Sequence, residues 1–218
     1  IKHNPKLVFI CNPNNPTGYV YSRDEIKTLV EIVKKHNLFL IADEVYREFT
    51  YENACHTSIL EFSEIQENAI VIDSVSKRYS MCGARIGCII SKNAEFISTA
   101  MKFAQARLSP PTLAQIASTA AMDVGEEYFD SVINEYNERR KTLIKGLNEI
   151  PGVKVSIPNG AFYCVVELPV KNSENFAKWL LEDFSLNNET IMVAPAAGFY
   201  SSLNTGENQV RIAYVLNQ

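Results

Sequence analysis

Three short apolar runs, each followed by polar or turn-forming residues, constrain the fold of this chain more than any other feature. The runs at Leu7–Cys11 and 38–42 are typical of buried strands, and the segment 22–37 between them combines a capping box with apolar residues at helical spacing. A third strand is expected at 69–72 and a fourth at 85–91. This strand–helix–strand order predicts an α/β fold, with a mostly parallel sheet and helices on both faces.

The second half of the chain has a different pattern. An alanine-rich stretch at 112–122 predicts a helix, and a longer periodic helix follows until Pro151-Gly152 stops it. Shorter elements are then expected, namely strands at 162–168 and 210–215 with a helix at 176–184. We therefore interpret 1–125 as part of a large domain, and 126–218 as a bridging helix with part of a smaller α+β C-terminal domain.

Polar residues that can do chemistry follow the predicted strands. Ser74, Ser76 and Lys77 come after the third strand, Asp43 ends the second, and Asn15 lies in the loop after the first. In parallel sheets, ligands bind beyond the carboxyl ends of the strands. The sequence therefore predicts that these side chains share one site.

The residue types in these motifs suit one kind of ligand. The amine of Lys77 can condense with an aldehyde, while the serine hydroxyls and the planar guanidinium of Arg85 can hold a phosphate. Each motif alone also has an ordinary explanation, such as a solvated lysine, a surface arginine or a turn-forming asparagine. It is the occurrence of all the motifs in one order that favours a site.

Taken together, Asn15-Pro16-Thr17-Gly18, Asp43-Glu44-Val45-Tyr46, Ser74-Val75-Ser76-Lys77 and Gly83-Ala84-Arg85-Ile86-Gly87 resemble the fold-type I pyridoxal-phosphate aminotransferases, in particular the aspartate aminotransferase class. The resemblance runs from the first strand to the end of the chain. It implies that pyridoxal 5′-phosphate is the cofactor. It also implies that the substrates are an amino acid and a 2-oxo acid, with aspartate or aromatic amino acids as plausible substrates.

The resemblance assigns a role to each motif residue. Lys77 would hold the cofactor covalently and move a proton between the substrate Cα and the cofactor C4′. Asp43 would face the pyridine nitrogen, and Tyr46 and Asn15 would donate to the phenolic oxygen. The phosphate ligands would be Ser74 and Arg85, with Ser76 as a weaker candidate. The Asn15–Pro16 bond is expected to be cis, and Val45 to pack on the ring or in the core.

Later residues are expected on the substrate side. Arg211 matches the arginine that grips the substrate carboxylate through paired hydrogen bonds. Phe162 is expected either to line the pocket or to fill the core of the smaller domain. Arg107 lies near the region where some family members bind a second carboxylate, but a surface role explains it equally well. Gly83 and Gly87 are expected to let the chain turn tightly around Arg85.

Composition excludes other classes of protein. The net charge of −4 provides no basic surface for nucleic acid, and no apolar run is long enough for a bilayer. The five cysteines contain no C-x-x-C pair and no metal-binding pattern, which favours reduced, mostly buried thiols in a cytoplasmic protein. The three histidines are expected to be ordinary surface or half-buried side chains.

The chain reaches its first cofactor motif almost at once, so we expect a piece truncated at both ends. On this interpretation the parent protein is a homodimer, and the piece alone is inactive and exposes apolar surface. Three alternatives stay open. They are another enzyme of the same fold (a carbon–sulfur lyase or an aminocyclopropane-carboxylate-synthase type), a non-catalytic module, and a nucleotide-binding domain, although no phosphate-loop motif supports the last.

Overall fold

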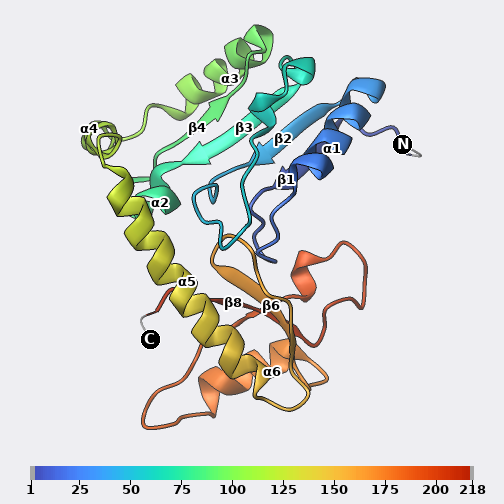
Figure 1. Cartoon of the computed structure of the whole chain (residues 1–218), viewed down its shortest axis with the longest axis vertical. Coiled ribbons are helices and arrows are strands. Elements are labelled where there is room, and N and C mark those ends of the chain that lie inside the picture. Colours follow the sequence, from blue (N-terminus) through green and yellow to red (C-terminus); the bar gives the residue numbers. More distant parts are fainter. Residues whose placement is uncertain (1–2, 217–218) are drawn as a thin grey trace.

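A computed structural model describes residues 3–216, which form two four-stranded sheets joined along a long helix (Figure 1). The first sheet has the order β1-β2-β3-β4; its first three strands are parallel and β4 is antiparallel. The mostly parallel sheet predicted from the sequence is therefore confirmed. The strands of this sheet are β1 (Leu7–Cys11), β2 (Phe39–Asp43), β3 (Ala69–Ser74) and β4 (Gly87–Ile90).

The second sheet is antiparallel and has the order β5-β6-β8-β7. It belongs to the C-terminal part, as the alternation of short strands and a helix predicted. Its strands are β5 (Lys154–Val155), β6 (Tyr163–Glu167), β7 (Ala194–Pro195) and β8 (Gln209–Ala213). The helices of the molecule are α1 (Arg23–His36), α2 (Val75–Arg78), α3 (Ala94–Arg107), α4 (Thr112–Ala121), α5 (Glu126–Asn148) and α6 (Ser173–Glu182).

The ends of α1 lie where the sequence predicts them. The Ser22 side chain accepts the backbone N–H of Glu25, and the Glu25 carboxylate accepts the backbone N–H of Ser22 at 2.8 Å, which completes the capping box. Asn37 ends the helix in the left-handed conformation that short polar side chains tolerate. The buried face of α1 packs on the first sheet through Ile26, Val30 and Val33.

The register of the first sheet aligns the ends of its strands. Cys11 pairs with Asp43, and Asp43 pairs with Ile72 just before β3 ends. Ser74, the last residue of β3, pairs with Gly87 at the start of the antiparallel β4. The polar residues at and after the ends of β1, β2 and β3 therefore lie together where the three parallel strands end.

The two faces of this sheet differ in how they are covered. One face packs on α1 and on two 3-10 turns, Ile59–Glu61 and Ser63–Ile65. On the other face α3 lines a groove with Ile89 of β4, while Leu7 and Phe9 of β1 are 46% and 57% exposed. Helices thus contact both faces, and the predicted exposed apolar surface is present.

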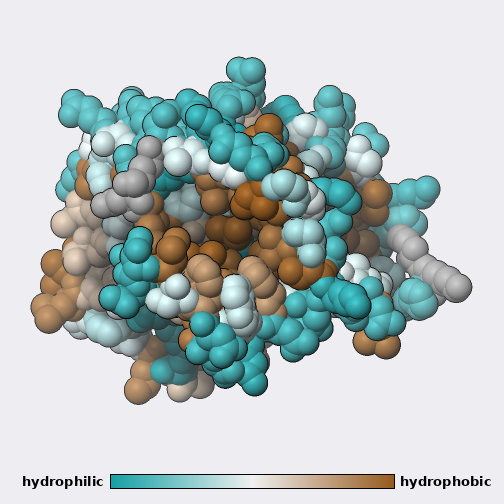
Figure 2. Space-filling model, turned by 90° about the horizontal axis from the view of Figure 1, so that it is seen from below, coloured by the Kyte–Doolittle hydropathy of each residue, from teal (hydrophilic) through white to brown (hydrophobic). Residues whose placement is uncertain are grey.

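The C-terminal part also leaves large apolar side chains exposed. They include Leu181, Leu186, Met192 and Leu203. Figure 2 shows the molecule from below, where hydrophobic side chains gather around a hollow and hydrophilic side chains surround them. Apolar surface of this extent is typical of a face that another part of a protein covers.

Several predictions about local structure need correction. The helix α3 was not predicted. None of its residues is buried, although Phe96, Ala100 and Phe103 recur at helical spacing and line the groove next to β4. The fourth strand begins at Gly87, which leaves Arg85 in the turn before it. The thiols are not mostly buried, because Cys55, Cys82 and Cys88 are exposed.

Candidate active site

One cavity of about 400 Å³ lies at the edge where the parallel strands end. Its lining comes from β1, from the ends of β2 and β3, from α2, and from the loops and the turn that join these elements. The lining residues are Phe9, Cys11, Asn15, Asp43, Val45, Tyr46, Ser74, Ser76, Lys77, Cys82 and Arg85. The cavity therefore gathers every predicted catalytic and cofactor-binding residue.

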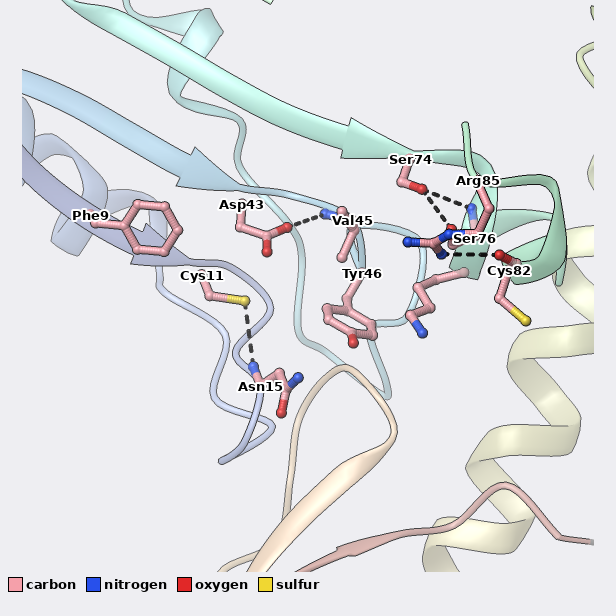
Figure 3. Close-up of a pocket in the computed structure, with 11 residues that line it drawn as sticks. Phe9, Cys11, Asn15, Asp43, Val45, Tyr46, Ser74, Ser76, Cys82 and Arg85 are labelled. Carbon is pink, nitrogen blue, oxygen red and sulfur yellow. Dashed lines mark hydrogen bonds between the residues drawn. The ribbon is translucent and has the colours of Figure 1, made fainter. Parts of the chain in front are cut away.

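Ser74, Ser76 and Arg85 lie together on one side of the cavity (Figure 3). Ser74 caps the short helix α2, because its Oγ accepts the N–H of Ser76 at 3.0 Å. The same hydroxyl is 2.8 Å from the hydroxyl of Ser76 and 2.8 Å from the carbonyl oxygen of Ile86. Two hydroxyls and a guanidinium at one end of the cavity can bind a phosphate group.

Arg85 itself makes the tight turn before β4. Its φ of 57° lies in the left-handed region, and its Nη1 donates to the carbonyl oxygen of Cys82 at 3.1 Å. The prediction that Gly83 enables this turn is wrong, because its φ is not positive and a Cβ there would meet nothing within 4 Å. Gly87 does permit close packing, since a Cβ there would lie 3.0 Å from the carbonyl oxygen of Asp73.

Lys77 lies on α2, one helical turn beyond the cap. Among the residues that the structure describes, its Nζ makes no hydrogen bond or ion pair, and it lies 5.9 Å from the centre of the Phe162 ring. An amine without such a partner is available for a covalent bond to a carbonyl compound.

Asp43 ends β2 with its carboxylate in the cavity. One oxygen, Oδ1, accepts the backbone N–H of Val45 at 3.2 Å, and no residue within 3–216 donates to the other. Burial raises the pKa of this carboxyl, the hydrogen bond from Val45 opposes that rise, and the charge of Asp73 adds to it. The free oxygen therefore suits a donor on a ligand, in particular a ring N–H.

Tyr46 and Asn15 face the cavity from neighbouring loops. The Tyr46 hydroxyl is 3.1 Å from the hydroxyl of Tyr163, and both groups are buried. The Asn15 side-chain oxygen accepts a hydrogen bond from Nη1 of Arg211 at 3.0 Å. The Asn15 amide N–H groups are therefore left to donate to a ligand. Arg211 does not line the cavity, but this bond places it directly beside it.

The loop that carries Asn15 is fixed by the C-terminal part. Its Asn15–Pro16 bond is cis, as predicted, and Asn12–Pro13 is cis as well. The carbonyl oxygen of Gly18 accepts the backbone N–H groups of Asn159 and Gly160 at 2.9 and 2.8 Å. Asn159 and Gly160 of the C-terminal part thus pack against the loop that carries Asn15.

A cluster of four charges lies behind the lysine motif and was missed from the sequence. Arg78 contacts Oδ2 of Asp73 at 2.6 Å and Oε1 of Glu48 at 2.7 Å, and Arg47 contacts the same two oxygens at 3.4 and 3.0 Å. The cluster joins α2 to β3 and to the loop after β2. Because its members come from three separate segments, no local motif identifies it.

For two residues the structure decides between the alternatives that the sequence left open. Phe162 packs in a core with Tyr46 and Phe49 and does not line the cavity. Arg107 lines the separate groove between α3 and β4, so it has no contact with the candidate site. Phe9 and Cys11 also line the cavity, and this was not predicted from the sequence. The two residues alternate along β1, so they lie on the same face of the sheet as Asp43, which pairs with Cys11; this pattern could have identified them.

The donor set fits pyridoxal phosphate. Hydroxyls and a guanidinium stand at one end, a lysine amine stands next to them, and a carboxylate with a free oxygen and an amide donor stand on the other loops. These groups match a phosphate, an aldehyde, a ring nitrogen and a phenolic oxygen respectively. The cavity volume is within the range typical of small-molecule sites.

Comparison with known proteins gives the class to which this fold and site belong. The chain matches the family described as "Aminotransferase class I and II" over residues 1–217, and it belongs to that family. Pyridoxal phosphate is the cofactor on which aminotransferases of this family depend. The chain spans about half the length of the curated relatives it matches.

Particular relatives can be named. The chain is 32% identical to an aspartate aminotransferase of Pyrococcus horikoshii, with 100% of this chain and 54% of the relative covered. It is 33% identical to an aspartate aminotransferase of Bacillus sp. (strain YM-2), with 98% and 54% covered. The structure of N-succinyldiaminopimelate aminotransferase from Mycobacterium tuberculosis superposes with a TM-score of 0.86 at 26% identity, covering 96% of this chain and 54% of that one.

Residues 3–216 contain no group of three or more His, Cys, Asp or Glu side chains arranged to hold a metal ion. Within the same residues, no helix has both the length and the apolar character needed to cross a membrane.

Proposed function

We propose that this chain carries much of the active site of a pyridoxal-phosphate-dependent aminotransferase that moves an amino group between an amino acid and a 2-oxo acid. The observation that supports the proposal is that one cavity gathers the Lys77 amine, the Asp43 carboxylate and the Arg85 guanidinium at the ends of the parallel strands. The names of the relatives favour aspartate or aromatic amino acids as substrates.

The residues divide the work. When bound, pyridoxal phosphate supplies an aldehyde and an electron-accepting ring. Lys77 would hold the aldehyde covalently, and its amine would move a proton between the substrate Cα and C4′ of the cofactor. Asp43 keeps the ring nitrogen protonated, and Ser74, Ser76 and Arg85 anchor the phosphate.

The substrate side is formed by Arg211. Its guanidinium can pair with the substrate carboxylate through two hydrogen bonds, which orients the Cα–H bond for proton removal. Its bond to Asn15 places it beside the group that would donate to the phenolic oxygen. Substrate and cofactor contacts are thereby linked through one amide side chain.

Chemical trapping of the cofactor tests the assignment of Lys77. The full-length protein is loaded with pyridoxal phosphate, reduced with borohydride and mapped by peptide mass spectrometry. The label is expected on Lys77, with no visible absorption band in Lys77→Ala. The matched control is Lys92→Ala, which removes an exposed lysine bonded to Gln66 and should leave the band intact. A label on another amine contradicts the proposal.

A half-reaction separates transamination from other chemistry on the same fold. Addition of an amino acid without an acceptor should yield the 2-oxo acid and an aminated cofactor in equal amounts. A screen across acidic, aromatic and aliphatic amino acids then gives the preferred substrate. Release of lyase products without an aminated cofactor would instead identify a carbon–sulfur lyase or a related enzyme.

The remaining predictions about the whole protein belong to the same proposal. We propose a cytoplasmic homodimer, which cell fractionation and analytical ultracentrifugation can test. We also propose that residues 1–218 alone are inactive, because Phe9, which lines the cavity, is more than half exposed and leaves the cavity open to water. Detectable transamination by the isolated chain would refute this part.

A further inference from the structure

We propose that Tyr163 is a positioning residue that serves both sides of the active site, with its hydroxyl acting on Tyr46 and its ring acting on Arg211. This inference rests on the proposed function. Tyr163 starts β6 and is 8% exposed, so its contacts are made inside the protein. Its position links the cofactor side of the cavity to the substrate side.

The first contact fixes the direction of a hydrogen bond. The hydroxyls of Tyr46 and Tyr163 are 3.1 Å apart, and either could donate. A phenol has only one proton, so if Tyr46 donates to the phenolic oxygen of the cofactor, Tyr163 must donate to Tyr46. A hydroxyl that accepts a hydrogen bond becomes a stronger donor, which makes Tyr163 a support for the cofactor contact.

The second contact orients the substrate arginine. The guanidinium carbon of Arg211 lies 4.8 Å from the centre of the Tyr163 ring and 5.3 Å from the centre of the Phe199 ring. Two aromatic rings at this range attract the cation and restrict its rotation. The bond of Nη1 to Asn15 fixes the guanidinium further. Arg211 is thus held in place before a substrate arrives.

The two roles of Tyr163 can be tested separately, because each depends on a different part of its side chain. The hydroxyl acts on Tyr46, and the ring acts on Arg211. Tyr163→Phe removes the first and retains the second, whereas Tyr163→Leu removes both. A role limited to packing would not separate in this way, because phenylalanine fills nearly the same space as tyrosine.

The test titrates the visible absorption of the bound cofactor with pH in the full-length protein. In Tyr163→Phe the phenolic oxygen loses support for its negative charge, so the titration midpoint should rise by roughly half a pH unit. The KM for the amino acid should stay within about twofold of the wild type, since the ring remains. Tyr163→Leu should also raise KM by about fivefold, as expected for the loss of one cation–π contact.

The control is Tyr214→Phe. Tyr214 is another buried tyrosine of the core that contains Tyr46, but its hydroxyl donates to the carbonyl oxygen of Ala161 at 3.3 Å and not to Tyr46. This variant should leave both the midpoint and KM unchanged. A Tyr163→Phe midpoint equal to that of the wild type would overturn the inference while the proposed function stands. If the wild type itself binds no cofactor, the proposed function fails and the inference fails with it.

Discussion

The charge cluster behind the lysine motif leads to a prediction about stability. Arg78→Met removes the guanidinium that contacts Asp73 at 2.6 Å and Glu48 at 2.7 Å. The side chains of Arg78 and Asp73 are 13% and 6% exposed, so water can replace the lost contacts only in part. Breaking a buried ion pair by removing one partner costs about 3–5 kcal/mol, whereas an exposed pair contributes about 0–1 kcal/mol.

The neighbouring Arg47 sets the expected value between these limits. After the substitution both carboxylates keep Arg47, at 3.4 Å from Asp73 and 3.0 Å from Glu48. Because neither acid is left without a cation, we expect a loss of about 2–3 kcal/mol in the free energy of unfolding. Arg78→Lys should recover only part of this loss, since an ammonium group cannot reach both acids with a planar fork.

The assay is urea unfolding of the full-length apoprotein, followed by circular dichroism and compared at equal m-values. Lys141→Met is the matched control, because Lys141 contacts Glu138 at 2.7 Å with both side chains more than half exposed. The control should change the free energy of unfolding by less than about 0.5 kcal/mol. If Arg78→Met is equally mild, the cluster does not fasten α2 to the sheet, and the reasoning is refuted.

Three further predictions concern packing, pH and the cofactor. Gly160→Ala should destabilise the protein by about 1–3 kcal/mol or more in urea unfolding, because its Cβ would lie 2.6 Å from Cγ2 of Val20. Gly83→Ala, with open space around it, should change stability by less than about 0.5 kcal/mol. Burial lowers the pKa of His56 to about 4, so the unfolded chain binds this proton first as pH falls below the ordinary value near 6.5. Between about pH 7 and pH 4 the wild type should therefore lose up to about 3 kcal/mol more of its free energy of unfolding than His56→Gln does. Equal losses in the two proteins would contradict the assignment. Asp43→Asn should reduce kcat by roughly a hundredfold. It should not lower the stability of the apoprotein, because burial already disfavours the charged form of the carboxyl. A measurable loss of stability in urea unfolding would argue against that cause.

The sequence predicts elements well where a local pattern carries the signal. The helix α1 has both caps and a regular apolar face, so its ends could be placed from Ser22 and Asn37. The helix α3 was missed even though Phe96, Ala100 and Phe103 lie at helical spacing along the groove, where Phe103 stays 74% exposed. Strands β5 and β7 contain two residues each, which is too short for a periodic pattern to emerge.

The candidate site shows the same division. Its motif residues could be named because each follows a predicted strand, and parallel strands end at a common edge. The groups that support them could not be named. Tyr163 reaches Tyr46 only through the packing of the C-terminal part, and Arg78 meets Glu48 only after α2 folds back on the loop after β2. Long-range contacts of this kind leave no local trace in a sequence.

The division of the chain at residue 125 stays a prediction, but the packing argues that the two parts do not fold independently. One core cluster joins Tyr46 and Phe49 from the N-terminal part to Phe162 and Tyr214 from the C-terminal part. The buried Arg140 of α5 reinforces this contact, since it donates to the carbonyl oxygen of Pro158 at 2.9 Å and pairs with Glu52.

A change in the C-terminal part should therefore be felt at the cofactor side. Pro158 directly precedes the two residues whose N–H groups bond to Gly18. Arg140 therefore supports the loop of Asn15 indirectly, through its hydrogen bond to Pro158. Truncation of that arginine would leave the carboxylate of Glu52 without its partner and the Pro158 carbonyl without its donor. The geometry of the cavity thus depends on a helix that supplies none of its lining residues.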